Sequence, residues 1–461
     1  MFDKNIYKKR REILKNKFNN GIIILAGNEN SPLDCKDNCY HFIQDSTFKY
    51  YFGISHPGLF GVIDIDNNKE IIFGKEYTID DIIWMGKQNY LNELSQMVGC
   101  EFQEITELKN YIFSKKNTEI HYTNTYKEDI LLSLCKILEK DIENFNKNIS
   151  YKLIKAIIEQ RSIKTEEEIE ELEKAANVTV SMHEEALKKT ISGKYEYEIV
   201  ADIEAAAKRE KCYTSFNTIF SKNGEILHNH LHNNKLNDGD LVLLDCGAKN
   251  EEGYCGDMTT TFPVSFKFTE RQKIIHDIVS KMFDRALELV RPGITYKEVH
   301  IEVCKILVEN FKKLNLLFGE TDKIVSAGAH ALFMPHGLGH MLGMDAHDME
   351  NFGEDFVGYD ENTKREKTFG ISALRLGKKL KEGNVLTIEP GIYFIPDLFY
   401  KWKSENKFSE FLNYNEIEKF LDFGGIRSER DILVTKDGCR ILGRYLPRKS
   451  YEIEEYISKF R

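Results

Sequence analysis

Residues 240–262, DLVLLDCGAKNEEGYCGDMTTTF, carry charges where an ordinary pair of strands needs none. The four apolar residues 241–244 predict a buried strand, yet that strand ends in Asp245. After a turn-like NEEG segment, the chain returns as a second strand that begins at Asp257. If the hairpin turns near Glu251, the two aspartates lie opposite each other about 5 Å apart, where like charges destabilise a sheet. A cation between the carboxylates, or a proton on one of them, would remove that cost.

The alternative is that both aspartates merely cap turns, but further carboxylates lie on similar strands. Glu389 ends the apolar stretch 385–388. Glu429 lies in a third predicted strand, where alternation places it on the same face as Arg427. Taken alone, Glu429 would be read as half of a cross-strand ion pair.

Three histidines lie between the 240–262 hairpin and the strand that leads to Glu389, within twelve residues: His336, His340 and His347. His336 and His340 are four residues apart, a spacing that suits a metal site on a helix, but the two glycines between them favour a loop. A lone histidine is usually structural, whereas three among glycines that allow close approach are candidates for a site.

Together these segments offer four carboxylates and an imidazole. Oxygen ligands with one nitrogen and no thiolate suit manganese, with cobalt or zinc as alternatives. Four carboxylates exceed the needs of one ion, whereas two ions about 3.5–4 Å apart would use them all. Such a pair can hold a shared hydroxide at neutral pH and polarise the carbonyl that it attacks. The residues by themselves therefore predict a dinuclear metallohydrolase.

Composition narrows the class of protein. A chain of 461 residues predicts two domains. Its 64 basic and 74 acidic residues argue against a nucleic-acid or anionic-membrane partner. The charged N-terminus lacks the apolar segment of a secretory signal, and no apolar run approaches the roughly 18 residues of a membrane span. Nine scattered cysteines do not form a disulfide framework, so we expect a cytoplasmic protein with reduced thiols.

The first third of the chain reads as an α/β domain. Residues 21–25, 61–65 and 70–73 predict strands, and the turn residues 66–68 join the last two as a hairpin. Residues 127–140 predict a helix.

A domain boundary is predicted just before Thr165, which forms a capping box with Glu168. The acidic run 166–168 reads as a solvated first turn that the helix dipole favours. Helices over 165–190 and 195–211 follow, and another helical stretch covers 270–315. We expect these helices to pack on a mostly antiparallel sheet.

Five motifs closely resemble the proline-specific branch of the creatinase/methionine-aminopeptidase superfamily, which comprises aminopeptidase P and prolidase. The resemblance implies five metal ligands in the matching motifs: Asp245 in LLDCGA, Asp257 in YCGDMTTTFP, His340 in HGLGHMLG, Glu389 in TIEPGIYF and Glu429 in GGIRSERD. It implies two divalent ions, above all Mn²⁺, in an α+β "pita-bread" catalytic domain over residues 162–461. The segment FIQDSTFKYYFGISHPG resembles the smaller aminopeptidase P-type N-terminal α/β domain, here 1–161.

The resemblance also implies roles beyond the metals. His228 would border the substrate pocket, whereas His230 and His232 are interpreted as surface residues. His336 and His347 would contact the substrate and shuttle protons, and Arg427 would orient the site. Glu389, or a water on the metals, would relay the proton. The substrate would be an Xaa-Pro peptide with its proline ring in an apolar pocket.

The sequence departs from the family pattern near Glu429. Ser428 stands where the family usually has an aliphatic residue, and Arg430 where it has an acidic one. Neither is a ligand, so the chemistry should survive. The hairpin between the two aspartates is one residue longer than the commonest form.

Two activities within the family remain open. Arg375 matches a prolidase arginine that binds the free carboxylate of a dipeptide, although it could equally be a surface arginine. The type of N-terminal domain favours an Xaa-Pro aminopeptidase, which we expect to accept dipeptides as well. The rival interpretations are a strict Xaa-Pro dipeptidase, a metallohydrolase of another substrate class and a non-catalytic binding protein on the same fold. The family suggests a homodimer.

Overall fold

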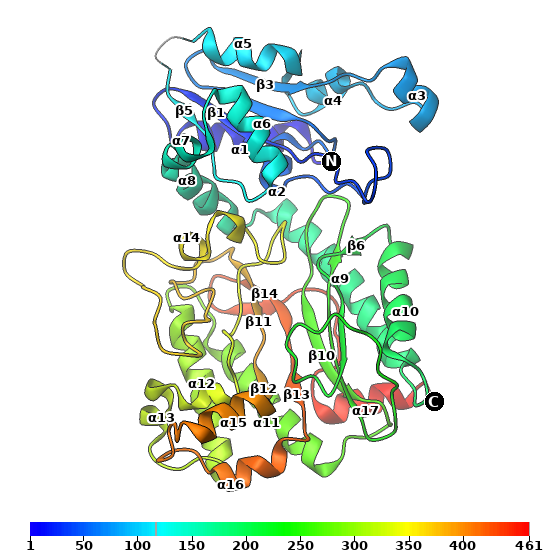
Figure 1. Cartoon of the computed structure of the whole chain (residues 1–461), viewed down its shortest axis with the longest axis vertical. Coiled ribbons are helices and arrows are strands. Elements are labelled where there is room, and N and C mark those ends of the chain that lie inside the picture. Colours follow the sequence, from blue (N-terminus) through cyan, green and yellow to red (C-terminus); the bar gives the residue numbers. More distant parts are fainter. Residues whose placement is uncertain (116–117, 461) are drawn as a thin grey trace. The chain divides into compact units, whose positions relative to one another are not determined.

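The computed structural model describes residues 1–115 and 118–460, and its chain divides into the units Met1–Arg161 and Ser162–Arg461 (Figure 1). The first unit has one sheet in the order β4-β3-β2-β1-β5. Its strands are β1 (Ile22–Ala26), β2 (Phe60–Asp64), β3 (Lys69–Gly74), β4 (Glu101–Glu104) and β5 (Ile120–His121). Its helices are α1 (Lys4–Lys15), α2 (Ser46–Phe52), α3 (Ile79–Met85), α4 (Leu91–Met97), α5 (Leu108–Phe113), α6 (Glu128–Leu138), α7 (Ile142–Lys147) and α8 (Tyr151–Ser162).

Strand alternation explains the core of this unit. Every second residue of the central strands, such as Ile24, Val62 and Ile71, points to the same face, where α5 and α6 cover the sheet with residues such as Ile112 and Leu134. The β2–β3 hairpin is antiparallel, whereas β4 and β5 pair in parallel with β3 and β1. The unit is therefore an α/β structure on a mixed sheet.

The second unit contains several small sheets whose strand pairs are all antiparallel among the described residues. Its strands are β6 (Tyr213–Thr214), β7 (Ile219–Lys222), β8 (Leu241–Cys246), β9 (Ala248–Lys249), β10 (Met258–Pro263), β11 (Val385–Ile388), β12 (Gly391–Tyr393), β13 (Gly425–Arg427), β14 (Arg430–Val434) and β15 (Cys439–Ile441). Its helices are α9 (Glu166–Lys189), α10 (Glu196–Arg209), α11 (Glu270–Leu289), α12 (Tyr296–Lys313), α13 (Thr321–Ala327), α14 (Glu354–Gly358), α15 (Pro396–Ser404), α16 (Tyr414–Ile417) and α17 (Ser450–Ser458), with 3₁₀ turns such as η2 (Ala329–Leu332). In Figure 1, α9 and α10 lie on one side of the central strands and α12 and α13 on the other. The predicted α+β class is confirmed.

The predicted helical stretch 270–315 forms two helices, α11 and α12, and Pro292, which disrupts a helix interior, lies in the break between them. One helical detail differs from the sequence prediction. Glu168 is buried rather than solvated: its carboxylate accepts hydrogen bonds from the Thr165 backbone N–H and hydroxyl and from the Tyr254 hydroxyl. In the described parts of the chain, no helix has both the length and the apolar character that crossing a bilayer requires.

Candidate metal centre

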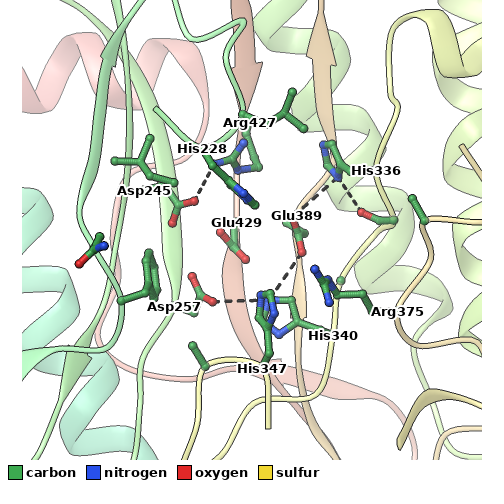
Figure 2. A pocket seen from close by; sticks show the side chains of 18 of the residues that line it. His228, Asp245, Asp257, His336, His340, His347, Arg375, Glu389, Arg427 and Glu429 are labelled. Atoms are coloured by element: carbon green, nitrogen blue, oxygen red, sulfur yellow. Dashed lines mark hydrogen bonds and ion pairs between the residues drawn. The ribbon is translucent and has the colours of Figure 1, made fainter. Parts of the chain in front are cut away.

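All ten residues that the sequence singled out line one cavity of about 450 Å³ in the second unit (Figure 2). They come from separate strand ends and loops of that unit, between residues 228 and 429. The labelled residues are His228, Asp245, Asp257, His336, His340, His347, Arg375, Glu389, Arg427 and Glu429. Tertiary packing thus brings together residues that lie up to about two hundred positions apart in the chain.

The two aspartates are neighbours, but not in the register that the sequence suggested. Asp245 pairs with Thr259, so Asp257 lies one diagonal step away on the same face rather than directly opposite. The prediction of directly opposed aspartates was wrong because the hairpin turns around Glu252, one residue later than assumed. The shared face still directs both carboxylates into the cavity.

His340 reaches the cavity from a loop that lies against β11. The backbone N–H of Thr387 donates to the His340 carbonyl, and Met341 bridges to Leu386. Gly339 permits this approach, because a Cβ there would lie 2.1 Å from the Thr387 carbonyl oxygen. The loop interpretation of this histidine pair is therefore correct.

The orientation of His340 suits a metal ligand. Its Nδ1 donates to the Met341 carbonyl at 3.1 Å, so in the neutral ring Nε2 carries a lone pair. That Nε2 faces Asp257 Oδ2 at 3.5 Å and Glu389 Oε1 at 3.7 Å, so acceptors face one another. Burial, followed by the nearby His347, holds the pKa of His340 well below its usual value, and a ring proton does not relieve the conflict. A bound metal ion would satisfy all three atoms.

The carboxylates give the same indication. Burial and the charges of neighbouring carboxylates raise the pKa of Asp257 and of Glu429 well above their usual values, and burial raises that of Glu389 to about 7. Among the described residues, no hydrogen bond reaches the buried Oδ1 of Asp245. Ligand atoms of Asp257, His340 and Glu429 lie within 4.8 Å of one another. The donor set therefore fits divalent ions, and the crowded acids need them.

Arg427 organises one side of the cavity. Its Nη2 donates to Asp245 Oδ2 at 2.6 Å, its Nε to Thr259 Oγ1 at 3.0 Å and its Nη1 to the Tyr393 hydroxyl at 2.8 Å. These three bonds leave the other oxygen of Asp245 directed at the cavity. The sequence identified Arg427 but missed its two other partners.

Tyr393 extends this network to a histidine. The His336 Nδ1 donates to the Gly337 carbonyl at 2.7 Å, so its Nε2 accepts from the Tyr393 hydroxyl, 3.1 Å away. The tautomer of His336 is therefore set by its neighbours, and its Nδ1 lies 3.8 Å from Glu389 Oε2. An aromatic residue three positions after Glu389's proline carried no sequence signal of this role.

Thr259 is a second residue that sequence reasoning missed. Its hydroxyl donates to Glu429 Oε2 at 2.7 Å and accepts from Arg427 Nε. Three successive threonines in a buried strand were the available signal, since alternation directs the first and third to the same face. Thr259 thus orients one candidate ligand through the bond to its carboxylate.

We expect Thr259→Val to weaken metal binding about 10–100-fold, the usual effect of removing a group that orients a ligand. Thr259→Ser retains the hydroxyl and is the matched control, for which we expect binding near that of the unmodified protein. Isothermal titration of the chelated proteins with Mn²⁺ measures the difference. Equal losses in both variants would show that packing, and not the hydroxyl, is responsible.

Arg430 and Asp431 bind the backbone of the strands that carry Asp257 and Glu429, from outside the cavity. Arg430 is buried and its Nη1 donates to the carbonyls of Glu429 and Thr259, at 2.6 and 2.9 Å. The Asp257 backbone N–H donates to both oxygens of Asp431, at 3.1 and 3.2 Å. The unusual arginine after Glu429 therefore contacts mainly backbone carbonyls and does not pair with the Glu429 carboxylate.

Two further histidines and an arginine lie at the rim. The ring of His347 is tilted by 53° against that of His340, with ring centroids 4.2 Å apart, and its Nδ1 is 3.4 Å from Glu350 Oε2. Arg375 Nη1 donates to Glu350 Oε2 at 2.6 Å and Glu354 Oε1 at 2.7 Å. His230, interpreted from the sequence as a surface residue, is exposed, and it also lines the cavity together with His228.

Comparisons with known proteins agree with this geometry. The model of metallopeptidase family M24 matches residues 170–436, and that of the aminopeptidase P N-terminal domain matches residues 7–121. A human Xaa-Pro dipeptidase is 32% identical over 94% of this chain and 88% of its own length. An Escherichia coli Xaa-Pro aminopeptidase is 30% identical over 97% of this chain and 96% of its own.

Solved structures give the same result. A histidine-to-alanine variant of Escherichia coli aminopeptidase P superposes with a TM-score of 0.83 at 28% identity, covering 100% of this chain and 99% of the other. A zinc-substituted form of that enzyme in complex with product gives a TM-score of 0.81, again at 28% identity with the same coverage.

Proposed function

This chain belongs to metallopeptidase family M24, and from that premise we propose that it releases the N-terminal residue of peptides that carry proline in second position. It is a metal-dependent Xaa-Pro peptidase that acts on proline-containing peptides. The observation that carries the proposal is the convergence of four carboxylates and a lone-pair-bearing imidazole on one cavity.

We propose two ions, with manganese as the native metal. The ligands would be Asp245, Asp257, His340, Glu389 and Glu429, whose oxygen-rich set suits a hard to borderline ion. When bound, the pair supplies a nucleophile at neutral pH and polarises the scissile carbonyl. Four carboxylates in one buried site support two ions rather than one, since a single divalent ion would leave net negative charge.

The residues around the ligands would bind and orient the peptide. Phe216, Ile219 and Leu227 give the cavity an apolar wall on which a proline ring can pack. Glu389 lies between His336 and His340, where it can take a proton from the nucleophile and pass it to the leaving nitrogen. His228 and His347 line the same cavity and would contact the substrate, while Arg427 would hold Asp245 in place.

The first experiment measures hydrolysis of Ala-Pro and Ala-Pro-Ala by the chelated protein, before and after Mn²⁺ is added. We expect metal-dependent release of alanine from both peptides and no cleavage of Ala-Ala-Ala, the matched control without proline. Cleavage of the dipeptide alone would identify a dipeptidase. No cleavage of either peptide by the metal-loaded protein would contradict the proposal.

Arg375 bears on the choice between these two activities. A strict dipeptidase would use its guanidinium to bind the free carboxylate of the substrate. In the structure Glu350 and Glu354 already bind Nη1, so a substrate carboxylate would have to compete with them. This pairing favours the aminopeptidase.

We therefore expect Arg375→Met to change the ratio of kcat/KM for Ala-Pro over Ala-Pro-Ala by less than about threefold. A carboxylate clamp contributes about 1.5–3 kcal/mol, so its loss would lower dipeptide hydrolysis selectively by roughly tenfold or more. Arg375→Lys retains the charge and controls for the unpaired glutamates. Selective loss of dipeptide activity in Arg375→Met would make the enzyme a prolidase.

We also propose a cytoplasmic homodimer. All nine cysteines are free, which suits a reducing compartment. In α3 the side chains of Ile79, Ile83 and Trp84 are 69%, 69% and 86% exposed, an apolar surface that a second copy could cover. Sedimentation equilibrium that gives only the 53.6 kDa monomer would contradict the dimer.

A further inference from the structure

A second cluster of ligand-type side chains lies in the core of the second unit. His300 and Cys304 are one turn apart on α12, and His330 lies in the turn η2. All three are fully buried, and one donor atom from each lies within 4.8 Å of the others. None of them lines the cavity of the metal centre.

Most ring nitrogens of this cluster lack a hydrogen bond of standard geometry. Among the described residues, no hydrogen bond of standard geometry reaches His300 Nδ1 or either ring nitrogen of His330, although the Ile324 carbonyl interacts with the His330 ring as a hydrogen-bond acceptor. The remaining nitrogen, His300 Nε2, is 3.6 Å from Cys304 Sγ, a weak contact. Buried polar atoms are nearly always hydrogen-bonded. A metal ion beside the thiol would take the lone pair of one nitrogen from each imidazole, and the Ile324 carbonyl could accept the N–H of His330.

We propose that His300, Cys304 and His330 bind a copper(I) ion, independently of the catalytic metals. A thiolate with two imidazoles is a soft donor set, unlike the oxygen-rich centre of the cavity, and selects copper(I) or zinc(II) over manganese. Three protein donors suffice for copper(I), whereas structural zinc almost always takes four.

The net charge of the bound site favours copper(I) over zinc(II). A thiolate neutralises a monovalent ion, whereas a divalent ion would leave a net positive charge in the core, and unpaired buried charge is costly. Burial alone shifts the pKa of Cys304. Besides burial, the groups that shift the pKa values of His300 and His330 are other histidines and the Ile324 carbonyl. No carboxylate acts on the cluster from the described elements around it, so nothing there would balance a second positive charge.

The protonation states fit binding. Burial lowers the pKa of His300 to about 3 and that of His330 to about 4, so both imidazoles are neutral and can donate a lone pair at once. Burial raises the pKa of the Cys304 thiol, so the thiol keeps its proton in the free protein, and formation of the copper–sulfur bond displaces that proton to solvent. One proton is released for each ion bound, and copper stays in the monovalent state.

A bound ion would brace the loop that carries the catalytic histidines. His330 lies six residues before His336, and α12 already holds this segment at two points. The rings of Phe311 and Phe333 meet edge to face at 4.6 Å. The Tyr296 hydroxyl, which donates to the Thr387 carbonyl at 2.6 Å, also lies 3.3 Å from the Leu338 carbonyl oxygen. A copper ion bound between α12 and η2 would add a third contact between this helix and the segment that carries His336.

The test is anaerobic titration of the full-length protein with copper(I) against a chromophoric chelator. Cys35 and Cys39 are changed to serine throughout, because these exposed or half-exposed thiols could bind copper by themselves. We expect a single equivalent of tightly bound copper, X-ray absorption showing one sulfur and two nitrogen ligands, and a higher Tm. Cys304→Ala and His330→Gln should each lose this equivalent, whereas Cys135→Ala, which removes a buried thiol elsewhere, should retain it.

Circular dichroism and manganese-supported hydrolysis of Ala-Pro-Ala separate loss of the site from loss of the fold. The circular dichroism spectrum and the hydrolysis rate should be unchanged in Cys304→Ala. If alanine destabilises the core, Cys304→Ser replaces it as the variant that lacks the thiol. Equal copper uptake with and without Cys304 would overturn the proposal. So would an absence of uptake by the unmodified cluster, and so would equal affinity for zinc(II), which would contradict the charge argument.

Discussion

Replacing Asp257 by asparagine should lower kcat/KM for Ala-Pro-Ala by at least about 10³-fold, a loss of roughly 4 kcal/mol in transition-state stabilisation. Asp257 is 4% exposed and lies beside both His340 and the other carboxylates. An amide has the same shape but carries no charge, so it binds a divalent ion more weakly and does not balance the charge of that ion. Metal analysis of the purified variant should show fewer bound ions.

The same variant tests how metal binding contributes to stability. A ligand that binds only the folded protein stabilises it by about 2.7 kcal/mol at a hundred times its Kd, so Mn²⁺ should raise the Tm of the unmodified protein. Asp257→Asn should lose most of that rise. Asp238→Asn, which makes the same change at an exposed position of the same unit, should keep both activity and the rise. Full activity in Asp257→Asn would remove this aspartate from the metal centre.

Arg427→Lys should lower both stability and activity. The guanidinium makes three hydrogen bonds in different directions, to Asp245, Thr259 and Tyr393, and a lysine ammonium on a flexible chain cannot reproduce them. Breaking a buried ion pair costs about 3–5 kcal/mol, so we expect the free energy of unfolding to fall by about 3 kcal/mol. We expect kcat to fall by about 10²-fold as Asp245 and His336 lose their orientation.

Urea unfolding and steady-state kinetics measure these two effects. The control is Arg440→Lys, in which a surface arginine paired with Glu173 makes the same exchange. Surface pairs contribute at most about 1 kcal/mol, so this control should change little. A loss in Arg427→Lys no larger than that of the control would show that the buried network has no special role.

Much of the candidate site could be predicted because its residues violate local expectation. Asp245 and Glu389 end buried apolar strands, where a charge has no structural purpose. All ten residues predicted from such anomalies and from the family motifs line the same cavity. Their individual roles stay predictions until the variants are measured.

The residues that sequence reasoning missed behave normally in the sequence. Thr259 suits a strand, and Tyr393 suits a buried aromatic position; their importance comes from partners that are distant in the chain. The cluster of His300, Cys304 and His330 was missed for the same reason, since thirty residues separate His300 from His330. The pairing of Asp245 depended on which residue is at the centre of the turn. Moving that centre by one residue moves the partner of Asp245 by two positions, from Asp257 to Thr259.

The amino-acid sequence was enough to predict the class of chemistry and the strands that carry it, because alternation and unexpected charges are local properties. It also determined the antiparallel hairpin of the first unit, through apolar stretches that flank a turn. Only the tertiary structure decided which atoms face one another: the Nε2 of His340 turned to two carboxylates, the three bonds of Arg427, and the glutamates that already hold Arg375. Hydrogen bonds and charge act through space over a few ångströms, and only folding sets those distances.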